Sequence, residues 1–101
     1  MGRGARMRPA RLHEKLLQIR RAFDLTQEEM ARRLGFSEIT REYVSGYELG
    51  TREPPLPVLL QYARVAGVCV DALIADELNL PAKLPNIPKH VGLRGNVGIK
   101  K

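Results

Sequence analysis

The feature that most constrains how this chain folds is a pair of short amphipathic segments, each bounded by its own start and stop signals. In the first segment, Thr26 is placed to cap free backbone amides, and Glu29, three residues on, is placed to complete a capping box. Gly35 then provides the left-handed residue that commonly ends a helix. The pattern predicts a helix over about residues 27–34. The apolar residues on its inner side are Met30, Ala31 and Leu34.

The second segment follows after a turn at residues 36–39. Thr40 is its predicted cap, and Gly50 is its predicted stop, because Pro54 and Pro55 beyond it prevent continuation. Polar side chains occupy the face that its apolar residues, Val44 and Tyr47, leave free. Both segments are too short to be stable in isolation, so they must pack against other helices.

Apolar residues at helical spacing predict three further helices. A helix over residues 11–23 would bury Leu12, Leu16, Ile19 and Phe23. A fourth, starting at Pro57 and ending before Gly67, would bury Leu59, Leu60, Ala63 and Ala66. A fifth, over residues 70–75, would close the core with Val70, Leu73 and Ile74. The predicted fold class is therefore all-α, with a compact five-helix domain over residues 11–80.

Three stretches of sequence, at residues 25–31, 44–50 and 52–54, resemble the signature of Xre-type, phage-repressor-like (Cro/repressor) helix-turn-helix regulators. They read Leu-Thr-Gln-Glu-Glu-Met-Ala, Val-Ser-Gly-Tyr-Glu-Leu-Gly and Arg-Glu-Pro. The resemblance covers about residues 12–80 and implies a bacterial or phage-like transcriptional regulator that binds double-stranded DNA sequence-specifically. The helix at about residues 40–49 would enter the major groove, and a homodimer on a pseudo-palindrome is expected. The turn 36–39 is about three residues longer than is usual in this family.

The resemblance implies that the helix over residues 40–49 reads bases with its first turns. Arg41 can bind guanine O6 and N7, and Glu42 can accept a hydrogen bond from cytosine N4, with Tyr43 beside them. Ser45 and Gly46 would face the DNA one turn further on, and the glycine would allow a close approach. Two alternatives stay open: Arg41 and Glu42 form an exposed charge pair, or Gly46 is a poorly optimised surface position.

Backbone phosphates would be bound by Gln27, Thr40 and Arg52, since the start of a helix favours an anion. The competing interpretation makes Gln27 and Arg52 solvated surface residues. The resemblance also implies a buried structural ion pair between Arg20 and Glu48.

The net charge of +6 belongs to the ends of the chain. Residues 1–11 carry four bases and residues 81–101 carry five, both without an acid, whereas residues 12–80 hold eleven acids and eight bases. Glycine, proline and like charge predict a flexible basic arm over residues 1–10 and a partly disordered Pro/Gly-rich basic tail over residues 81–101. The arm either follows a minor groove or has no role.

Several classes of protein are disfavoured. The sequence contains no run of eighteen apolar residues, the length needed to span a membrane. Residues 1–11 lack the apolar middle of a signal peptide, so a cytoplasmic, nucleoid-associated protein is expected. Cys69 is expected to be a buried thiol and a weak helix cap, and with His13 and His90 it shows no metal-ligand spacing. No activated nucleophile or phosphate loop is present, so no metal, cofactor or catalytic residue is expected.

A second hypothesis concerns the tail over residues 81–101. Its aliphatic residues are more numerous than a purely solvated segment needs, so part of it would lie on the domain or on another protein. These residues are Leu84, Ile87, Val91, Leu93, Val97 and Ile99. The alternative function is therefore an antitoxin-like protein-interaction module whose C-terminal tail binds a partner protein.

Overall fold

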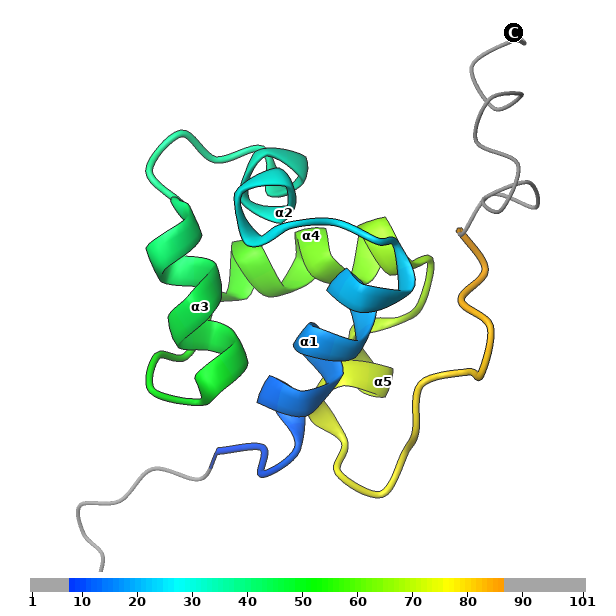
Figure 1. The fold of residues 1–101 in the computed structure, drawn as a ribbon. Coiled ribbons are helices and arrows are strands. Elements are labelled where there is room, and N and C mark those ends of the chain that lie inside the picture. Colours follow the sequence, from blue (N-terminus) through cyan, green and yellow to red (C-terminus); the bar gives the residue numbers. More distant parts are fainter. Residues whose placement is uncertain (1–7, 87–101) are drawn as a thin grey trace, which may run out of the picture.

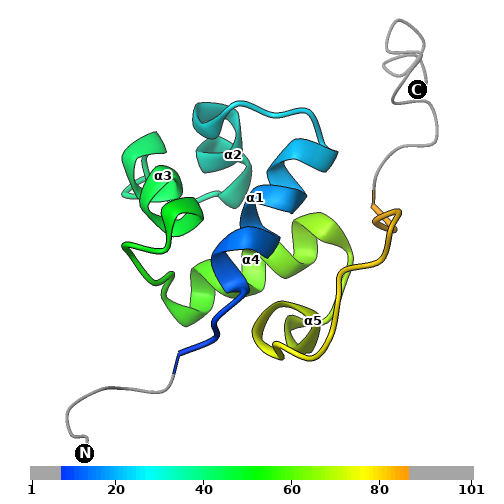
Figure 2. The ribbon, with the colours of Figure 1, turned by 60° about the horizontal axis from the view of Figure 1, so that its bottom comes forward.

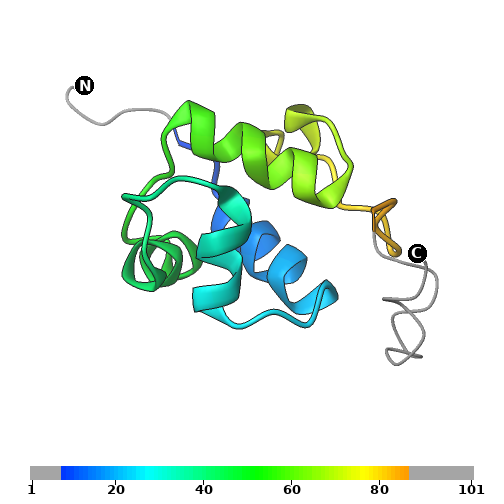
Figure 3. The same ribbon diagram turned by 90° about the horizontal axis from the view of Figure 1, so that it is seen from above.

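Five α-helices and no strand make up residues 8–86, the part of the chain that this computed structural model describes. The helices are α1 (Leu12–Ala22), α2 (Gln27–Leu34), α3 (Arg41–Leu49), α4 (Leu56–Ala66) and α5 (Val70–Ile74). α3 packs against α1 and α2, and α5 lies on the other side of α1 (Figures 1 and 2). Seen from above, α4 and α5 form one layer over α1, α2 and α3 (Figure 3). The predicted all-α, five-helix architecture is confirmed.

The start and the end of α2 follow the sequence closely. The hydroxyl oxygen of Thr26 accepts the backbone N–H of Glu29 at 3.0 Å, and the Glu29 carboxylate accepts the backbone N–H of Thr26 at 2.8 Å. Gly35 ends the helix with φ +86°, a left-handed conformation that strains a residue carrying a Cβ atom. The predicted capping box is therefore confirmed.

α3 begins and ends where the sequence predicts, but the expectation that the Thr40 side chain caps it is wrong. Thr40 occupies the N-cap position with extended backbone, and its side chain makes no capping hydrogen bond. Its hydroxyl instead donates a hydrogen bond to the carboxylate of Glu42, a local side-chain contact. The amides of the first turn of α3 are left without a side-chain cap from this residue.

The core is a single cluster of buried side chains to which every helix contributes. Leu16 and Ile19 of α1, Met30 of α2, Val44 of α3 and Leu73 of α5 are fully buried. The other members are Leu12, Phe23, Ala31, Leu34, Tyr47, Val58, Leu59, Tyr62, Ala63, Ala66, Leu80 and Leu84. The hydroxyls of Tyr47 and Tyr62 are buried without a hydrogen-bond partner in the structure.

Two residues predicted to be in the core lie on the surface, and one helix starts earlier than predicted. Leu60 of α4 is 39% exposed and Ile74 of α5 is 44% exposed, because α4 turns Val58 and Tyr62 inward instead of Leu60 and α5 buries Leu73. α4 begins at residue 56, so its proline stands within the first turn but not at the first position.

The domain extends beyond residue 80. Leu84 is buried in the core, and the Asn86 amide donates through Nδ2 to the carbonyl oxygen of Arg64 at 2.8 Å. At the other end, the backbone N–H groups of Ala10 and Arg11 donate to the Asp76 carboxylate at 2.9 and 3.0 Å. The structure thus anchors the last residues of the predicted arm and the first residues of the predicted tail. Residues 1–7 and 87–101, including the tail aliphatics from Ile87 onward, lie outside the described residues.

Candidate nucleic-acid interface

α3 is held to the domain by one side and exposes the side chains of its first turn. Val44 and Tyr47 are buried, whereas the side chains of Arg41 and Glu42 are 67% and 72% exposed. Arg41 Nε lies 3.4 Å from Glu42 Oε2, so the two charges pair. The pKa of the Glu42 carboxyl is lowered by hydrogen bonds from the backbone N–H of Glu42 and from the Thr40 hydroxyl. Two groups with the chemistry to face a base pair therefore stand together at the start of α3.

A buried carboxylate connects α1, α2 and α3. Arg20 of α1 donates to Glu48 of α3 through Nε at 2.6 Å and through a second guanidinium nitrogen at 3.0 Å, so the ion pair implied by the resemblance is present. The hydrogen bond to Glu48 raises the pKa of the Arg20 guanidinium. Gln27, the first residue of α2, donates through Nε2 to the same carboxylate at 3.0 Å. The side chain expected at a phosphate is thus oriented by the ion pair.

Gly46 does not lie open on the outer face of α3. It is buried, and a Cβ atom built on it would lie 3.0 Å from Cβ of Arg52 and 3.5 Å from Oγ1 of Thr51. The close approach that the glycine allows is therefore made by the chain's own loop, and we leave Gly46 out of the proposed base-reading set. Ser45 and Tyr43 are half-buried.

Arg52 is exposed, and its guanidinium carbon lies 4.3 Å from the centre of the Tyr43 ring. Tyr43 in turn packs against the buried Tyr47, with ring centres 6.5 Å apart. The structure therefore brings three residues predicted separately, Tyr43, Gly46 and Arg52, into one contact.

The turn between α2 and α3 folds partly inward. Phe36 and Ile39 pack against the core, while Ser37 and Glu38 between them are exposed. Beside the turn lies a hollow of about 740 Å³. Its lining residues are Glu28, Ala31, Arg32, Gly35, Phe36, Ser37, Ile39, Thr40, Arg41 and Glu42. Residues of the turn thus line a hollow beside the start of α3.

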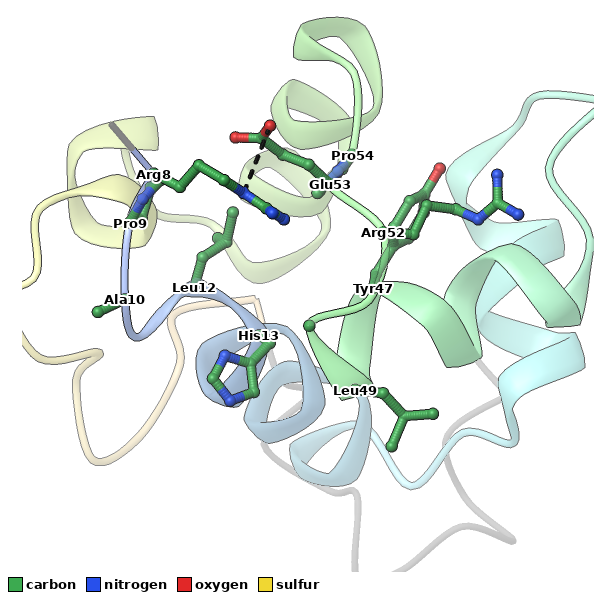
Figure 4. A pocket seen from close by; sticks show the side chains of 11 residues that line it. Arg8, Pro9, Ala10, Leu12, His13, Tyr47, Leu49, Arg52, Glu53 and Pro54 are labelled. Carbon is green, nitrogen blue, oxygen red and sulfur yellow. Dashed lines mark ion pairs between the residues drawn. The ribbon is translucent and has the colours of Figure 1, made fainter. Parts of the chain in front are cut away.

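A second hollow, of about 340 Å³, lies where the start of the chain meets the loop after α3 (Figure 4). Arg8 Nε lies 3.8 Å from Glu53 Oε1 across it, and His13 lies beside Gly50. The Arg52 side chain extends away from Arg8 and His13 (Figure 4). The end of the basic arm is therefore next to the C-terminal end of α3.

Lys15 is a buried cation that the sequence interpretation missed. Its Nζ donates to the carbonyl oxygens of Ala72 and Ala75 at 2.9 and 2.8 Å, at the end of α5. Burial, the largest influence, lowers the pKa of its ammonium group. The signal was present, because residue 15 lies three positions after Leu12 and belongs to the same helical stripe as Ile19. Lys15 thus binds α5, which lies on the other side of α1 from α3 (Figure 1). Its role is therefore structural.

Cys69 is exposed, so the expectation of a buried thiol is wrong. It stands at the N-cap position of α5, outside the core, and makes no side-chain capping hydrogen bond. Within residues 8–86, no three His, Cys, Asp or Glu side chains are grouped closely enough to hold a metal ion. None of the described helices has the length and apolar character needed to cross a membrane.

Comparison with known proteins agrees with this geometry. A family model described as helix-turn-helix matches residues 16–73. Two curated relatives from Bacillus subtilis (strain 168) are the uncharacterized HTH-type transcriptional regulators YqaE, 39% identical over 66 residues, and YobD, 36% identical over 61 residues. The alignments cover 65% and 60% of this chain and 54% and 52% of the relatives, so the chain spans about half the length of the curated relatives it matches. No solved structure matches significantly.

Proposed function

Because the chain belongs to the Xre/Cro-like helix-turn-helix family, we propose that it is a sequence-specific transcriptional regulator that places α3 in the major groove of double-stranded DNA. The observation that carries this proposal is the exposed first turn of α3 on a helix whose other side is fixed in the core. A helix that reads bases in the major groove needs polar side chains on the side that faces the DNA and a fixed position on its opposite side. The comparison with relatives named as transcriptional regulators supports the regulatory role.

Base reading is assigned to the polar front of α3. The Arg41 guanidinium can bind guanine O6 and N7 with two parallel hydrogen bonds, and the Glu42 carboxylate can accept from cytosine N4. In the free protein these two side chains pair with each other, so binding exchanges one exposed ion pair for contacts with bases. Such exposed pairs contribute little to stability, about 0 to 1 kcal/mol, so the exchange is inexpensive. Ser45, half-buried one turn further on, completes the proposed set.

Phosphate binding is assigned to the start of α2, to Thr40 and to the loop after α3. Gln27 stands in the first turn of α2, where the positive end of the helix favours an anion, and its amide is held by Glu48. Arg52 is exposed beside α3. Residues 12–80 carry eleven acids and eight bases, so the basic segments 1–11 and 81–101 would supply most of the sequence-independent attraction to DNA.

A homodimer is the form we propose to bind DNA, since one such domain reads few base pairs and two-fold symmetry doubles the site. Half-sites would then lie about 34 Å apart, one turn of the DNA helix, or a multiple of this. Large apolar side chains that such a homodimer could bury are exposed on α4, on α5 and just after α5. They are Leu56, Leu60, Ile74 and Leu78.

We further propose that the protein acts in the bacterial cytoplasm, at the nucleoid.

Selection of bound sequences from a random DNA pool tests this function. The wild-type chain is expected to enrich one sequence, and Arg41→Ala is expected to lose the preference at one base pair, worth about 1 to 3 kcal/mol. Arg64→Ala removes an equal charge from the exposed face of α4 and serves as the matched control. An unchanged consensus for Arg41→Ala would remove this residue from the base-reading set. A wild-type chain that binds no duplex at low ionic strength would contradict the function itself.

A further inference from the structure

The outer face of α3 contains a position without a side chain, Gly46, and Arg52 of the loop after α3 fills the space there. Glu42, Ser45 and Gly46 are spaced three and four residues apart, so they share one face of the helix. At Gly46 this face is covered by Arg52, whose Cβ lies 3.0 Å from the place where a Cβ of residue 46 would stand. The loop after α3 thus contributes a cationic side chain to the surface that α3 presents.

The backbone of the loop is fixed against α3 at the same point. The backbone N–H groups of Thr51 and Arg52 donate to the carbonyl oxygen of Gly46 at 3.0 and 3.2 Å, and the Thr51 hydroxyl hydrogen bonds the same oxygen at 3.4 Å. An alanine at position 46 would push on Cβ of Arg52, an atom tied directly to this backbone. Gly46 therefore sets how closely the loop approaches the helix.

The far end of the Arg52 side chain is held by an aromatic ring. Its guanidinium carbon lies 4.3 Å from the ring centre of Tyr43, within the range in which a cation is attracted to the face of an aromatic ring. Tyr43 is half-buried and packs against Tyr47, so the ring is itself fixed. By contrast, the exposed guanidinium groups of Arg32 and Arg41 lie beside carboxylates.

We infer that Tyr43 and Gly46 are positioning residues that hold the Arg52 guanidinium at the edge of α3 for one backbone phosphate of the bound DNA. A guanidinium held over the face of a ring keeps its N–H donors in its own plane, free to bind an anion at its edge. Because the side chain is ordered before binding, less conformational entropy is lost on contact. This inference rests on the proposed function, and it moves Tyr43 from reading bases to supporting a phosphate contact.

The salt dependence of DNA binding measures this role, since each phosphate contact contributes about 0.9 to the slope of log K against log[salt]. The probe is a fluorescein-labelled duplex of fixed mixed sequence, titrated with the full chain between roughly 50 and 200 mM salt. Arg52→Ala is expected to lower the slope by about 0.9, the value of one contact, and to leave the sequence selected from a random pool unchanged. A consensus altered at one base pair would overturn the phosphate assignment.

Two substitutions at residue 43 separate positioning from direct contact. Tyr43→Leu removes the ring and is expected to lower the slope as much as Arg52→Ala does, whereas Tyr43→Phe keeps the ring and the wild-type slope. Added to Arg52→Ala, Tyr43→Leu should change affinity by less than about twofold, because both remove one interaction. An equal loss of affinity from Tyr43→Leu in both backgrounds would show that Tyr43 contacts DNA itself and would overturn the inference.

Gly46→Ala tests whether the close approach of the loop to α3, which the missing Cβ at residue 46 allows, positions Arg52. It is expected to weaken binding in the wild-type background and to have no further effect on Arg52→Ala, with circular dichroism checking that each variant is folded. If Gly46→Ala fails to fold, the residue 43 variants still decide the matter. Failure of the wild-type chain to bind the duplex at low salt rejects the proposed function. Binding with independent effects of Tyr43→Leu and Arg52→Ala rejects this inference alone.

Discussion

At the scale of single residues, Glu48 shows how one buried charge organises its neighbours. Its side chain is 5% exposed, and its carboxylate accepts two hydrogen bonds from Arg20 and one from Gln27. A buried charge is tolerated when it is paired and hydrogen-bonded. The same contacts fix the starting residue of α2 relative to the end of α3. The ion pair thus contributes to the shape of the candidate interface without touching DNA.

Glu48→Ala is expected to lower the free energy of unfolding by about 3 to 5 kcal/mol, because Arg20 would keep its charge in a largely buried position without a carboxylate. Urea denaturation followed by circular dichroism measures this. Glu28→Ala is the matched control: it removes one partner of an exposed i,i+4 pair whose side chains are 67% and 68% exposed, so its effect should stay below about 0.5 kcal/mol. Equal losses in the two variants would contradict the structural role of Glu48.

Only some of the contacts of Glu48 could be predicted from the sequence. The pairing of Arg20 with Glu48 was implied by family resemblance and is present in the structure. The contact from Gln27 was not predicted, because the direction of a surface amide depends on side chains brought close by folding. Gly46 was assigned to the DNA side for a similar reason: spacing gives the face of a helix, but it does not show that a loop covers that face.

At the scale of helices, start signals that look alike in sequence differ in the structure. Thr26 and Thr40 both occupy N-cap positions, yet only Thr26 accepts a backbone N–H of its own helix. Thr26→Ala should therefore destabilise the domain by about 1 kcal/mol, whereas Thr40→Ala should have a clearly smaller effect on unfolding. Thermal unfolding of the two variants compares them. The interpretation fails if Thr40→Ala is as destabilising as Thr26→Ala.

Helix positions were predictable because caps, stops and apolar spacing are local signals. All five helices begin and end within two residues of the expected bounds. The exposure of Leu60, Ile74 and Cys69 was not predictable, since an apolar or sulfur-containing residue beside a buried stripe is covered only if a neighbouring element reaches it. Those neighbours are set by how the helices pack, which no local pattern records.

At the scale of the whole molecule, contacts distant in sequence close the domain at both ends. The Asp76 carboxylate accepts the backbone N–H groups of Ala10 and Arg11, which lower the pKa of this carboxyl from its ordinary value of 3.8, helped by the nearby charges of Lys15 and Arg11. The ionised form is therefore favoured in the folded state. Its contribution to stability is fully present above about pH 3.8 and is lost as the pH falls through the lower folded-state pKa.

Asp76→Ala should accordingly lower the melting temperature at pH 7, and the difference from wild type should narrow as the pH drops below about 3.8. Melting curves recorded from pH 7 to pH 2.5 would follow this, with Glu38→Ala, which removes an exposed acid from the turn, as the control. A difference that stays constant with pH would mean that the charge of Asp76 is not what anchors the start of α1.

The residues just after position 80 also belong to the folded unit. Leu84→Ala should lower the free energy of unfolding by about 2 kcal/mol, the lower end of the range for a buried leucine, because it lies at the edge of the core. Lys83→Ala alters an exposed neighbour and should change the unfolding free energy by less than about 0.5 kcal/mol. If Leu84→Ala proves neutral to chemical denaturation, residues 81–86 do not contribute to the core.

The exposed thiol of Cys69 has a practical consequence. It is the single cysteine of the chain, and it precedes α5, which lies on the other side of the molecule from α3 (Figure 1). A maleimide dye would therefore attach at one defined place without any mutation and without obstructing α3, the helix that we propose enters the groove. The distance from such a dye to the end of a labelled duplex, followed by resonance energy transfer, would report the orientation in which the protein docks.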